Sequence, residues 1–336
     1  MKPVTKKQKL SLSSNLKKSL FIFIIFVIEC LIFTLGSQGK FLSSVNILNA
    51  SVQASVIVLI ALGQMYVIIT AGIDLSIGAN IGLAGFMAAK AIVFWHIPVG
   101  LGILIGIGSA TLVGLLSGLF IVYLQITPFI VTFVMQCIAR GFTYVMLGDK
   151  SSVFGMPESF IFLGSGNFLG IPMPIYIVVI IAIIFGLIIS KTKTGRYIYA
   201  VGSNSEAARL SGVNIKAALI KVYVISAFLA GITGIIAAAR LGAATATSGT
   251  NAELDAVAAT VIGGTSLMGG DGLPLATIIG ALIVGVLSNG LTLMGVSGNL
   301  QLIAKGVVVL IAAALDFFKK SDKFNSKLTY FLSAKR

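Results

Sequence analysis

The 336-residue chain is very apolar and poor in charge: hydrophobic residues make up 57%, charged residues 10%, and the mean hydropathy is +1.06. A soluble globular chain carries roughly 25% charged residues, so this chain could not cover a soluble surface of its size. The hydrophobicity excludes intrinsic disorder, and the two cysteines exclude a disulfide scaffold. The 38 glycines follow no G-X-Y period, which excludes collagen. The composition indicates a polytopic membrane protein.

The formal net charge of +14 is concentrated in three basic blocks. Of the 24 Lys and Arg residues, six lie in 1–19, six in 191–221 and six in 317–336. Basic segments of membrane proteins stay predominantly in the cytoplasm, so we expect all three blocks there, beside anionic lipid headgroups. This distribution argues against a nucleic-acid partner.

A spanning helix needs about 20 mostly apolar residues. We predict an all-α fold, a polytopic transmembrane helical bundle of about ten spans. An even number returns the chain to its starting side, which agrees with the charge pattern and places both termini in the cytoplasm. The eighth span is short and rich in glycine. The predicted spans are 20–36, 52–70, 77–95, 99–124, 129–148, 174–190, 218–240, 254–268, 273–294 and 300–316.

The chain is expected to hold one membrane domain, 20–316, between a basic cytoplasmic N-terminal tail, 1–19, and a basic cytoplasmic C-terminal tail, 317–336. The longest inward loop is 191–217. The N-terminus is similar to a signal peptide, but its long apolar core and the lack of an A-x-A site predict a retained first span. No G-x-x-x-x-G-K-[ST] phosphate loop occurs, and a nucleotide-binding domain would need roughly 100–200 more residues.

Residues that could perform chemistry are few and scattered. Cys30 and Cys137 lie 107 positions apart in separate apolar runs, and His96 is the single histidine. We therefore expect free thiols, no metal site, no catalytic cluster and no bound cofactor.

Small residues recur at helical spacing in one predicted span. Gly102 and Gly106 form one GxxxG pair, and Gly114 and Gly118 form another. Because apolar surfaces have no hydrophobic drive to associate within lipid, such pairs predict close helix contacts. These contacts could be static packing, or they could allow closely packed helices to slide or rock.

Two predicted interruptions, 70–78 and 263–272, bracket polar pairs with glycine. Non-helical backbone at membrane depth must be buried in protein or line a cavity, and broken helices in two halves of a transporter indicate a substrate path. Asp74 is the only carboxylate between 30 and 148. Alternatively, Asp74 caps a helix through the amides of Ser76 and Ile77, and the other polar residues only join helices. The candidate path residues are Gln64, Asp74, Ser76, Asn80, Gln136, Thr265, Ser266 and Asn289.

The inward loop contains a second candidate site. Ser203 and Glu206 match the S-x-x-E capping box, which predicts a helix start near Asn204, and Gly212 is a suitable stop. A helix of about eight residues, roughly 12 Å long, is too short to be stable alone and needs a surface to pack on. Alternatively, the whole loop is an ordinary cytosolic connector with no docking role. The predicted docking residues, with a small face and two rim charges, are Ser203, Asn204, Glu206, Ala207, Ala208, Arg209, Ser211 and Gly212.

Three blocks, 72–78, 194–212 and 253–270, occur together in this order. Over about 45–316 the chain resembles the ribose-type permease subunits of bacterial ABC sugar importers. It departs from that family at Ser203, where glycine is frequent, at Asp271, where a basic residue is frequent, and at Ala276, where glycine is usual.

The resemblance implies a permease in the bacterial inner membrane that moves a monosaccharide, with ribose as the first expectation, by alternating access. It implies a homodimeric or paired permease, a cytoplasmic ABC ATPase that hydrolyses ATP, and an extracytoplasmic sugar-binding protein. The segment from Asn204 to Gly212 would be the coupling helix. Hexoses, xylose and nucleoside-like substrates remain open.

Other classes of membrane protein are less well supported by the residues. An ion-coupled secondary transporter usually needs several intramembrane carboxylates or histidines, and Asp74 stands nearly alone. A membrane-embedded enzyme would need clustered catalytic groups, which the sequence does not contain. A passive channel would pass substrate without ATP.

Overall fold

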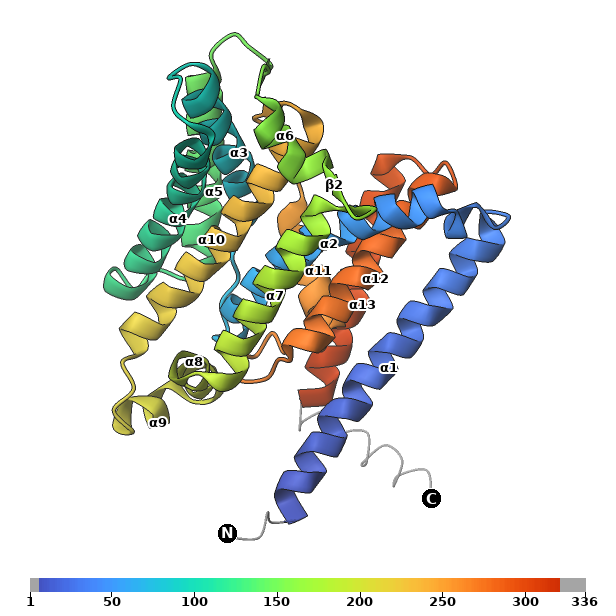
Figure 1. Cartoon of the computed structure of the whole chain (residues 1–336). Helices are drawn as coiled ribbons and strands as arrows, with labels where there is room; N and C mark the ends of the chain where they lie inside the picture. The colour runs from blue at the N-terminus through green and yellow to red at the C-terminus, as the bar shows by residue number, and fades with distance from the viewer. Residues whose placement is uncertain (1–5, 321–336) are drawn as a thin grey trace.

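The computed structural model describes residues 6–320, so the parts of the two predicted tails at 1–5 and 321–336 lie outside the described residues. Within 6–320 the chain forms thirteen α-helices and four strands of two residues each, which confirms the predicted helical fold (Figure 1). Helix α1 begins at Lys6, inside the predicted tail 1–19, but its apolar part starts at Ser19 as expected.

The helices follow the chain order of the predicted apolar segments. They are α1 (Lys6–Gly36), α2 (Ser44–Ile69), α3 (Ile77–Val93), α4 (Val99–Tyr123), α5 (Pro128–Leu147), α6 (Glu158–Ser165), α7 (Met173–Lys191), α8 (Lys193–Ser203), α9 (Ser205–Leu210), α10 (Ile215–Leu241), α11 (Ala252–Ile262), α12 (Pro274–Leu293) and α13 (Gly298–Lys320). A short 3₁₀ helix, Lys40–Leu42, precedes α2.

The four strands form two small antiparallel pairs. Strand β1 (Ser152–Val153) pairs with β4 (Ala244–Thr245), with Ser152 opposite Thr245, and β2 (Asn167–Phe168) pairs with β3 (Ile171–Pro172). The first pair ties the long loop after α5 to the loop after α10.

Seven of the described helices are long and apolar enough to cross a membrane: α1, α2, α4, α5, α7, α10 and α12. Helix α3, with 17 residues, is shorter. Helix α11 forms only the first part of the predicted short span 254–268, because it ends at Ile262 and covers about 16 Å of a roughly 30 Å hydrocarbon layer. Gly264, Gly269 and Gly270 take left-handed backbone conformations in the segment that follows, which prevents the helix from continuing.

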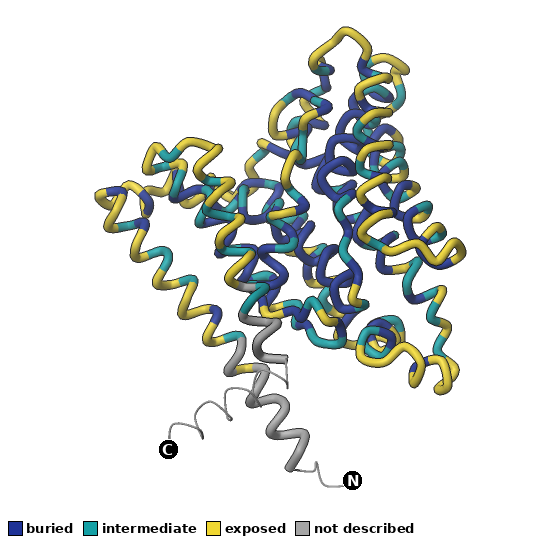
Figure 2. Tube along the Cα trace, turned by 180° about the vertical axis from the view of Figure 1, so that it is seen from behind, coloured by how far each residue is buried: buried dark blue, intermediate teal, exposed yellow. Residues whose placement is uncertain are grey.

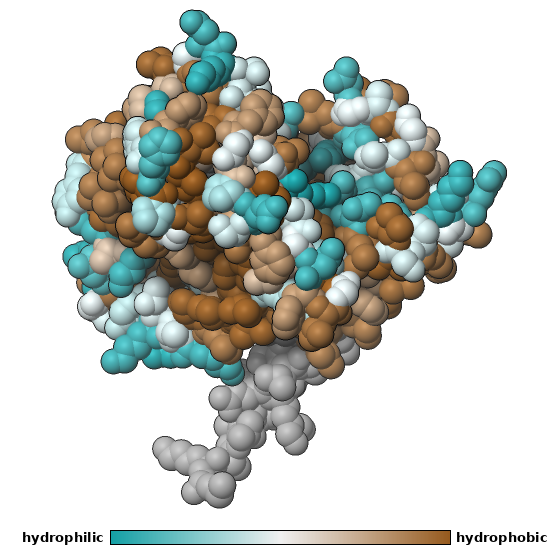
Figure 3. Space-filling view, turned by 45° about the horizontal axis from the view of Figure 1, so that its top comes forward, coloured by the Kyte–Doolittle hydropathy of each residue, from teal (hydrophilic) through white to brown (hydrophobic). Residues whose placement is uncertain are grey.

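Helices α2, α3 and α10 form the centre of the bundle, and 14 of the 17 residues of α3 are buried. The most apolar window of α2 is 89% buried inside the protein and that of α10 is 72% buried, whereas α1 reaches only 11% and α7 only 22%. Figure 2 shows the buried residues gathered in the middle of the molecule and exposed residues on the outer helices. Apolar side chains cover much of the visible flank (Figure 3). Such a flank suits lipid or another membrane subunit.

The two ends of the bundle differ. Helix α1 begins, and α13 ends, on the side of the bundle where α8 and α9 lie (Figure 1). Helix α6 lies towards the opposite end. Figure 3 shows a hollow with hydrophilic residues on that opposite end.

The glycine pairs of α4 make the predicted close contacts. A Cβ added at Gly106 would come within 2.5 Å of the Ala84 carbonyl oxygen on α3, and one at Gly114 within 2.5 Å of the Tyr223 carbonyl oxygen on α10. Helix α4 therefore packs with its backbone almost directly on two neighbours, as small residues in membrane helices allow.

We predict that Gly114→Ala lowers the free energy of unfolding by about 1–3 kcal/mol, because the added methyl group would overpack the contact with α10. Gly108 is a matched control on the same helix, since it is exposed and a Cβ there meets no atom within 4 Å. Gly108→Ala should leave stability unchanged or slightly higher. Thermal unfolding of the detergent-purified variants measures both, and equal melting temperatures would contradict the packing argument.

Candidate functional site

The first predicted interruption is observed as a non-helical segment, residues 70–76, between α2 and α3. Asp74 lies at its centre and is only 1% exposed. One carboxylate oxygen accepts hydrogen bonds from the Ser76 amide (2.9 Å) and the Ser76 hydroxyl (2.6 Å), and the other accepts from the Ser226 hydroxyl on α10 (2.7 Å). The carboxylate thus fastens this segment to a helix 152 positions away in sequence.

The other predicted residues near Asp74 belong to the same network. With its side-chain amide in the orientation that satisfies both groups, Gln64 of α2 donates to the Asp74 carbonyl oxygen (3.2 Å) and accepts from the Asp74 amide (3.3 Å). Asn80 donates to the Ser76 hydroxyl oxygen (3.1 Å). The capping alternative is half correct, because Asp74 binds the Ser76 amide, but no hydrogen bond to the Ile77 amide is observed in this network.

The backbone of this segment also has a partner on α5. The Thr132 hydroxyl donates to the Ile73 carbonyl oxygen (3.1 Å). Neither Thr132 nor Ser226 was recognised from the sequence, because each acts through a contact between distant segments and belongs to no local motif. Together, α2, α5 and α10 satisfy the polar groups of a segment that cannot bond to itself as a helix does.

The second interruption, residues 263–273, joins α11 to α12. Thr265 and Ser266 are each 1% exposed. The Thr265 hydroxyl lies 3.3 Å from the Thr277 hydroxyl of α12, and the Ser266 hydroxyl accepts from the Met268 amide (3.2 Å). Both predicted residues therefore stabilise the turn in the present conformation.

The remaining predicted path residues lie in two other places. Gln136 of α5 is half-buried and donates to Glu253 at the start of α11 (3.4 Å), and Arg140, one turn further along α5, donates to the carbonyl oxygens of Ala246 and Ser248.

Asn289 of α12 exchanges hydrogen bonds with Asn46 of α2 (3.0 and 3.1 Å). The eight predicted path residues thus form separate groups, and only the four around Asp74 share one network of hydrogen bonds.

An ion pair joins the C-terminal helix to this region. The Lys305 ammonium lies 2.8 Å from one carboxylate oxygen of Asp255 and donates to the other at 3.0 Å, and both side chains are less than one-fifth exposed. This pair links α13 to the short helix α11, which ends where the second interruption begins.

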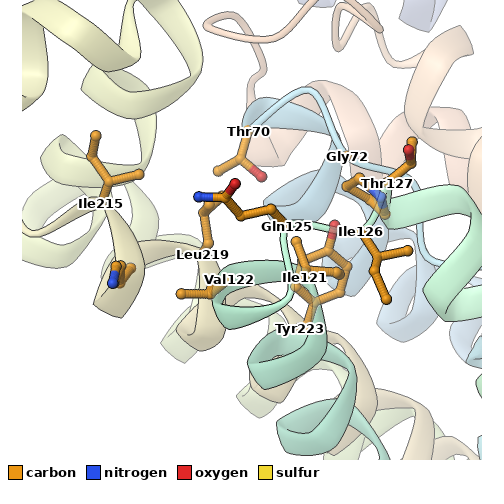
Figure 4. Close-up of a pocket in the computed structure, with 12 residues that line it drawn as sticks. Thr70, Gly72, Ile121, Val122, Gln125, Ile126, Thr127, Ile215, Leu219 and Tyr223 are labelled. Carbon is orange, nitrogen blue, oxygen red and sulfur yellow. The ribbon is translucent and has the colours of Figure 1, made fainter.

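A cavity of about 400 Å³ lies beside the first interruption, between the end of α4 and the start of α10 (Figure 4). In Figure 4, Gln125 extends between Thr70 and Leu219, and aliphatic side chains form most of the wall. Lys216 is its one charged lining residue. A monosaccharide needs several convergent polar partners, so this cavity lacks the chemistry of a complete sugar site.

The short helix α9 forms where the inward loop predicts one, but its cap differs. Ser203 is the last residue of α8, so the capping-box prediction is wrong. Asn204 is the N-cap instead, and its side-chain oxygen accepts from the Ala207 amide (3.0 Å). Glu206 bonds Arg209 on its own helix, at 2.6 and 3.0 Å, rather than reaching back to Ser203.

The end of α9 matches the prediction. Gly212 has a left-handed backbone (φ 79°), its amide donates to the Arg209 carbonyl oxygen, and the Val213 amide donates to the Ala208 carbonyl oxygen. These two bonds are those of a Schellman motif. The Ser211 hydroxyl also bonds back to the Ala207 carbonyl oxygen (2.9 Å).

The exposed face of α9 differs from the predicted small face. Ala208 is only 5% exposed and packs with Val201 and Ala218 inside the protein, so its predicted place on a docking surface is wrong. Leu210 is 75% exposed and was not predicted. Arg209 lowers the pKa of Glu206 by hydrogen bonding, so the two side chains stay charged and paired at neutral pH.

A helical bundle with two interrupted segments, and with a capped surface helix in its longest basic loop, is the architecture of a multi-pass membrane protein. Residues 46–313 match the family described as the permease component of the branched-chain amino acid transport system.

The chain is 41% identical to the ribose import permease of Haemophilus influenzae, over 84% of this chain and 88% of that protein. It is 41% identical to the ribose import permease of Bacillus subtilis, over 82% and 86%. It is 36% identical to the D-allose permease of Escherichia coli, over 88% and 90%. No solved structure matches the chain.

The chain belongs to this family of permeases, which confirms the resemblance to ABC importer permeases. It is accordingly a transport subunit of the bacterial inner membrane.

We predict that Ser226→Ala lowers the free energy of unfolding by about 1–3 kcal/mol, because it leaves one oxygen of the buried Asp74 carboxylate without its partner. Ser117 is a matched control: it is equally buried, at 1% exposed, but its hydroxyl bonds only the Val113 carbonyl of its own helix. Ser117→Ala should cost less. Thermal unfolding in detergent measures the difference, and a smaller effect at Ser226 would show that the contact is dispensable.

Proposed function

We propose that this chain is the membrane permease of an ATP-driven importer that carries a monosaccharide into the cytoplasm by alternating access. Ribose is the proposed substrate, because the two ribose permeases are 41% identical to this chain and the D-allose permease is 36% identical. The observation that carries the proposal is this identity over more than four-fifths of each chain. It includes both interrupted segments and the loop with α9.

The proposed topology has ten crossings and cytoplasmic termini. The third crossing would combine residues 70–76 with α3, and the eighth would combine α11 with residues 263–273. The common placement of α8, α9, the start of α1 and the end of α13 supports this arrangement, as do the basic blocks in the sequence (Figure 1). The proposed domains remain a membrane permease domain, 20–316, between two basic cytoplasmic tails.

The proposed partners act at opposite ends of the bundle. A cytoplasmic ABC ATPase would bind ATP and dock on α9, whose exposed residues include Glu206, Ala207, Arg209 and Leu210. An extracytoplasmic sugar-binding protein would deliver substrate at the end with the hydrophilic hollow (Figure 3). A second copy of the permease would pack on an apolar flank within the lipid. This chain would bind no cofactor of its own.

The substrate path is proposed along the side of α5 that carries Gln136. Gln136 is half-buried, whereas Gln64, Asp74, Ser76, Asn80, Thr265, Ser266 and Asn289 are buried and bonded to protein groups. Six of these residues would therefore hold the interrupted segments, whereas Asn289 joins α12 to α2. All seven would meet substrate only in another conformation. Gln136, with Glu253 and Arg140 nearby, offers amide, carboxylate and guanidinium groups that bind sugar hydroxyls.

We predict ATP-dependent ribose uptake when the permease is reconstituted in vesicles with its ATPase and its sugar-binding protein. Radiolabelled ribose inside the vesicles is the measurement, and vesicles lacking ATP or lacking the ATPase are the controls. Uptake that persists in those controls would identify a channel or an ion-coupled carrier. ATP-dependent uptake of another sugar but not ribose would retain the importer and change its substrate.

We predict that Leu210→Asp weakens binding of the ATPase about tenfold, because a charge would replace an exposed apolar side chain at the centre of the proposed contact. Leu169→Asp is the control, since Leu169 is similarly exposed, at 83%, but lies in the β2–β3 turn. Titration of the purified ATPase onto permease in nanodiscs measures the affinity. Unchanged binding by the Leu210 variant would move the docking site away from α9.

A further inference from the structure

Helix α8 lies directly before the proposed coupling helix, with only Asn204 between them. It was not recognised in the sequence, where its residues read as part of a connector. Ile198 and Val201 are buried, and Gly195 lies against the backbone of Ile189 at the end of α7. Helix α8 is therefore packed into the body of the bundle, whereas α9 projects from it (Figure 1).

Helix α8 contacts the end of α2, where the first interruption begins. Gly202 packs so closely on the Ile69 carbonyl group that no Cβ could be accommodated there. A Cβ at Gly202 would also come within 2.9 Å of the Gly270 amide nitrogen. The backbone of α8 thus touches the backbone of both interrupted regions at one point.

The second interruption is bonded to the same place. The Gly270 amide donates to the Ile69 carbonyl oxygen (2.9 Å), and the Tyr199 hydroxyl donates to the Gly272 carbonyl oxygen (2.6 Å). We call residues 69–71, 199–203 and 269–272 the α8 junction. It joins three segments through backbone contacts and two hydrogen bonds.

Tyr199 is suited to hold this junction at every physiological pH. Its hydroxyl is largely buried, and burial raises its pKa to about 12. The group therefore remains protonated and keeps donating to the Gly272 carbonyl oxygen. A deprotonated tyrosine could not donate this bond.

We propose that the α8 junction moves as one body with α9. The conformational change of the ATPase would then displace the ends of both interrupted segments together. This inference rests on the proposed function, and it makes Tyr199 a positioning residue for transport. Its physical basis is the contact of backbone on backbone at Gly202, because closely packed groups with no intervening side chain transmit displacement rather than absorb it. Without the Tyr199 hydrogen bond, residues 269–272 would be displaced less than α8 when α8 moves.

The test compares two tyrosines of α8, of which only Tyr199 donates a hydrogen bond to the second interruption. Tyr199→Phe removes only the hydroxyl that bonds Gly272. Tyr197→Phe removes the hydroxyl of a side chain that is 45% exposed and makes no hydrogen bond within residues 6–320. Both variants are assembled with the ATPase and the sugar-binding protein in vesicles. Ribose taken up per ATP hydrolysed is the measurement.

We expect Tyr199→Phe to lower the ratio of ribose uptake to ATP hydrolysis about five- to tenfold, the equivalent of one lost buried hydrogen bond, while ATPase binding stays normal. Tyr197→Phe should keep the wild-type ratio. An unchanged ratio in the Tyr199 variant would overturn the inference. Absence of ATP-driven uptake in the wild-type complex would instead overturn the proposed function, so the two failures are distinguishable.

Discussion

The need to satisfy backbone polar groups inside the membrane determines how this bundle is built. A helix satisfies its own amides and carbonyls, but residues 70–76 and 263–273 satisfy only some of theirs through turns, and lipid offers the others no partner. The solution is a set of side chains from neighbouring helices: Gln64 holds the Asp74 backbone, and Thr132 binds the Ile73 carbonyl oxygen. The central helices α2 and α10 supply such partners, and so does α5.

The same requirement connects the interruptions to the surface. The carbonyl of Ile69, left free where α2 ends, accepts from the Gly270 amide of the other interruption, and Tyr199 of α8 satisfies the Gly272 carbonyl. Segments that are 200 positions apart therefore meet beside the loop that carries α9. Bonds that complete the hydrogen bonding of two broken helices also provide a direct mechanical connection from that loop into the membrane domain.

Hydropathy and glycine placement predicted the helix positions and both interruptions, because these depend on composition over ten or more residues. Local contacts were predicted less well. Ser203 and Asn204 are both plausible caps in sequence, and the choice depends on α8 ending at Ser203, which leaves Asn204 in the extended conformation of an N-cap. Helix α8 was missed although its buried residues Gly195, Ile198 and Val201 recur every three positions along one face. Ser226 was missed because its role depends on Asp74, a partner remote in sequence.

The burial of the predicted path residues limits where a sugar could bind within one chain. A sugar presents several hydroxyl groups, and each that leaves water needs a polar partner. All eight candidates already bond to protein groups within the described chain, and seven of them are also buried. The cavity near Gln125 is walled mainly by aliphatic side chains. Of the eight candidates, Gln136 is the one that is partly exposed. It lies on α5 beside exposed apolar residues such as Phe133, which suit a contact with another subunit. A path between two copies would place two such α5 faces opposite each other by symmetry, and so double the polar groups that one chain supplies. This argument favours a path at the subunit interface over one enclosed within a single bundle.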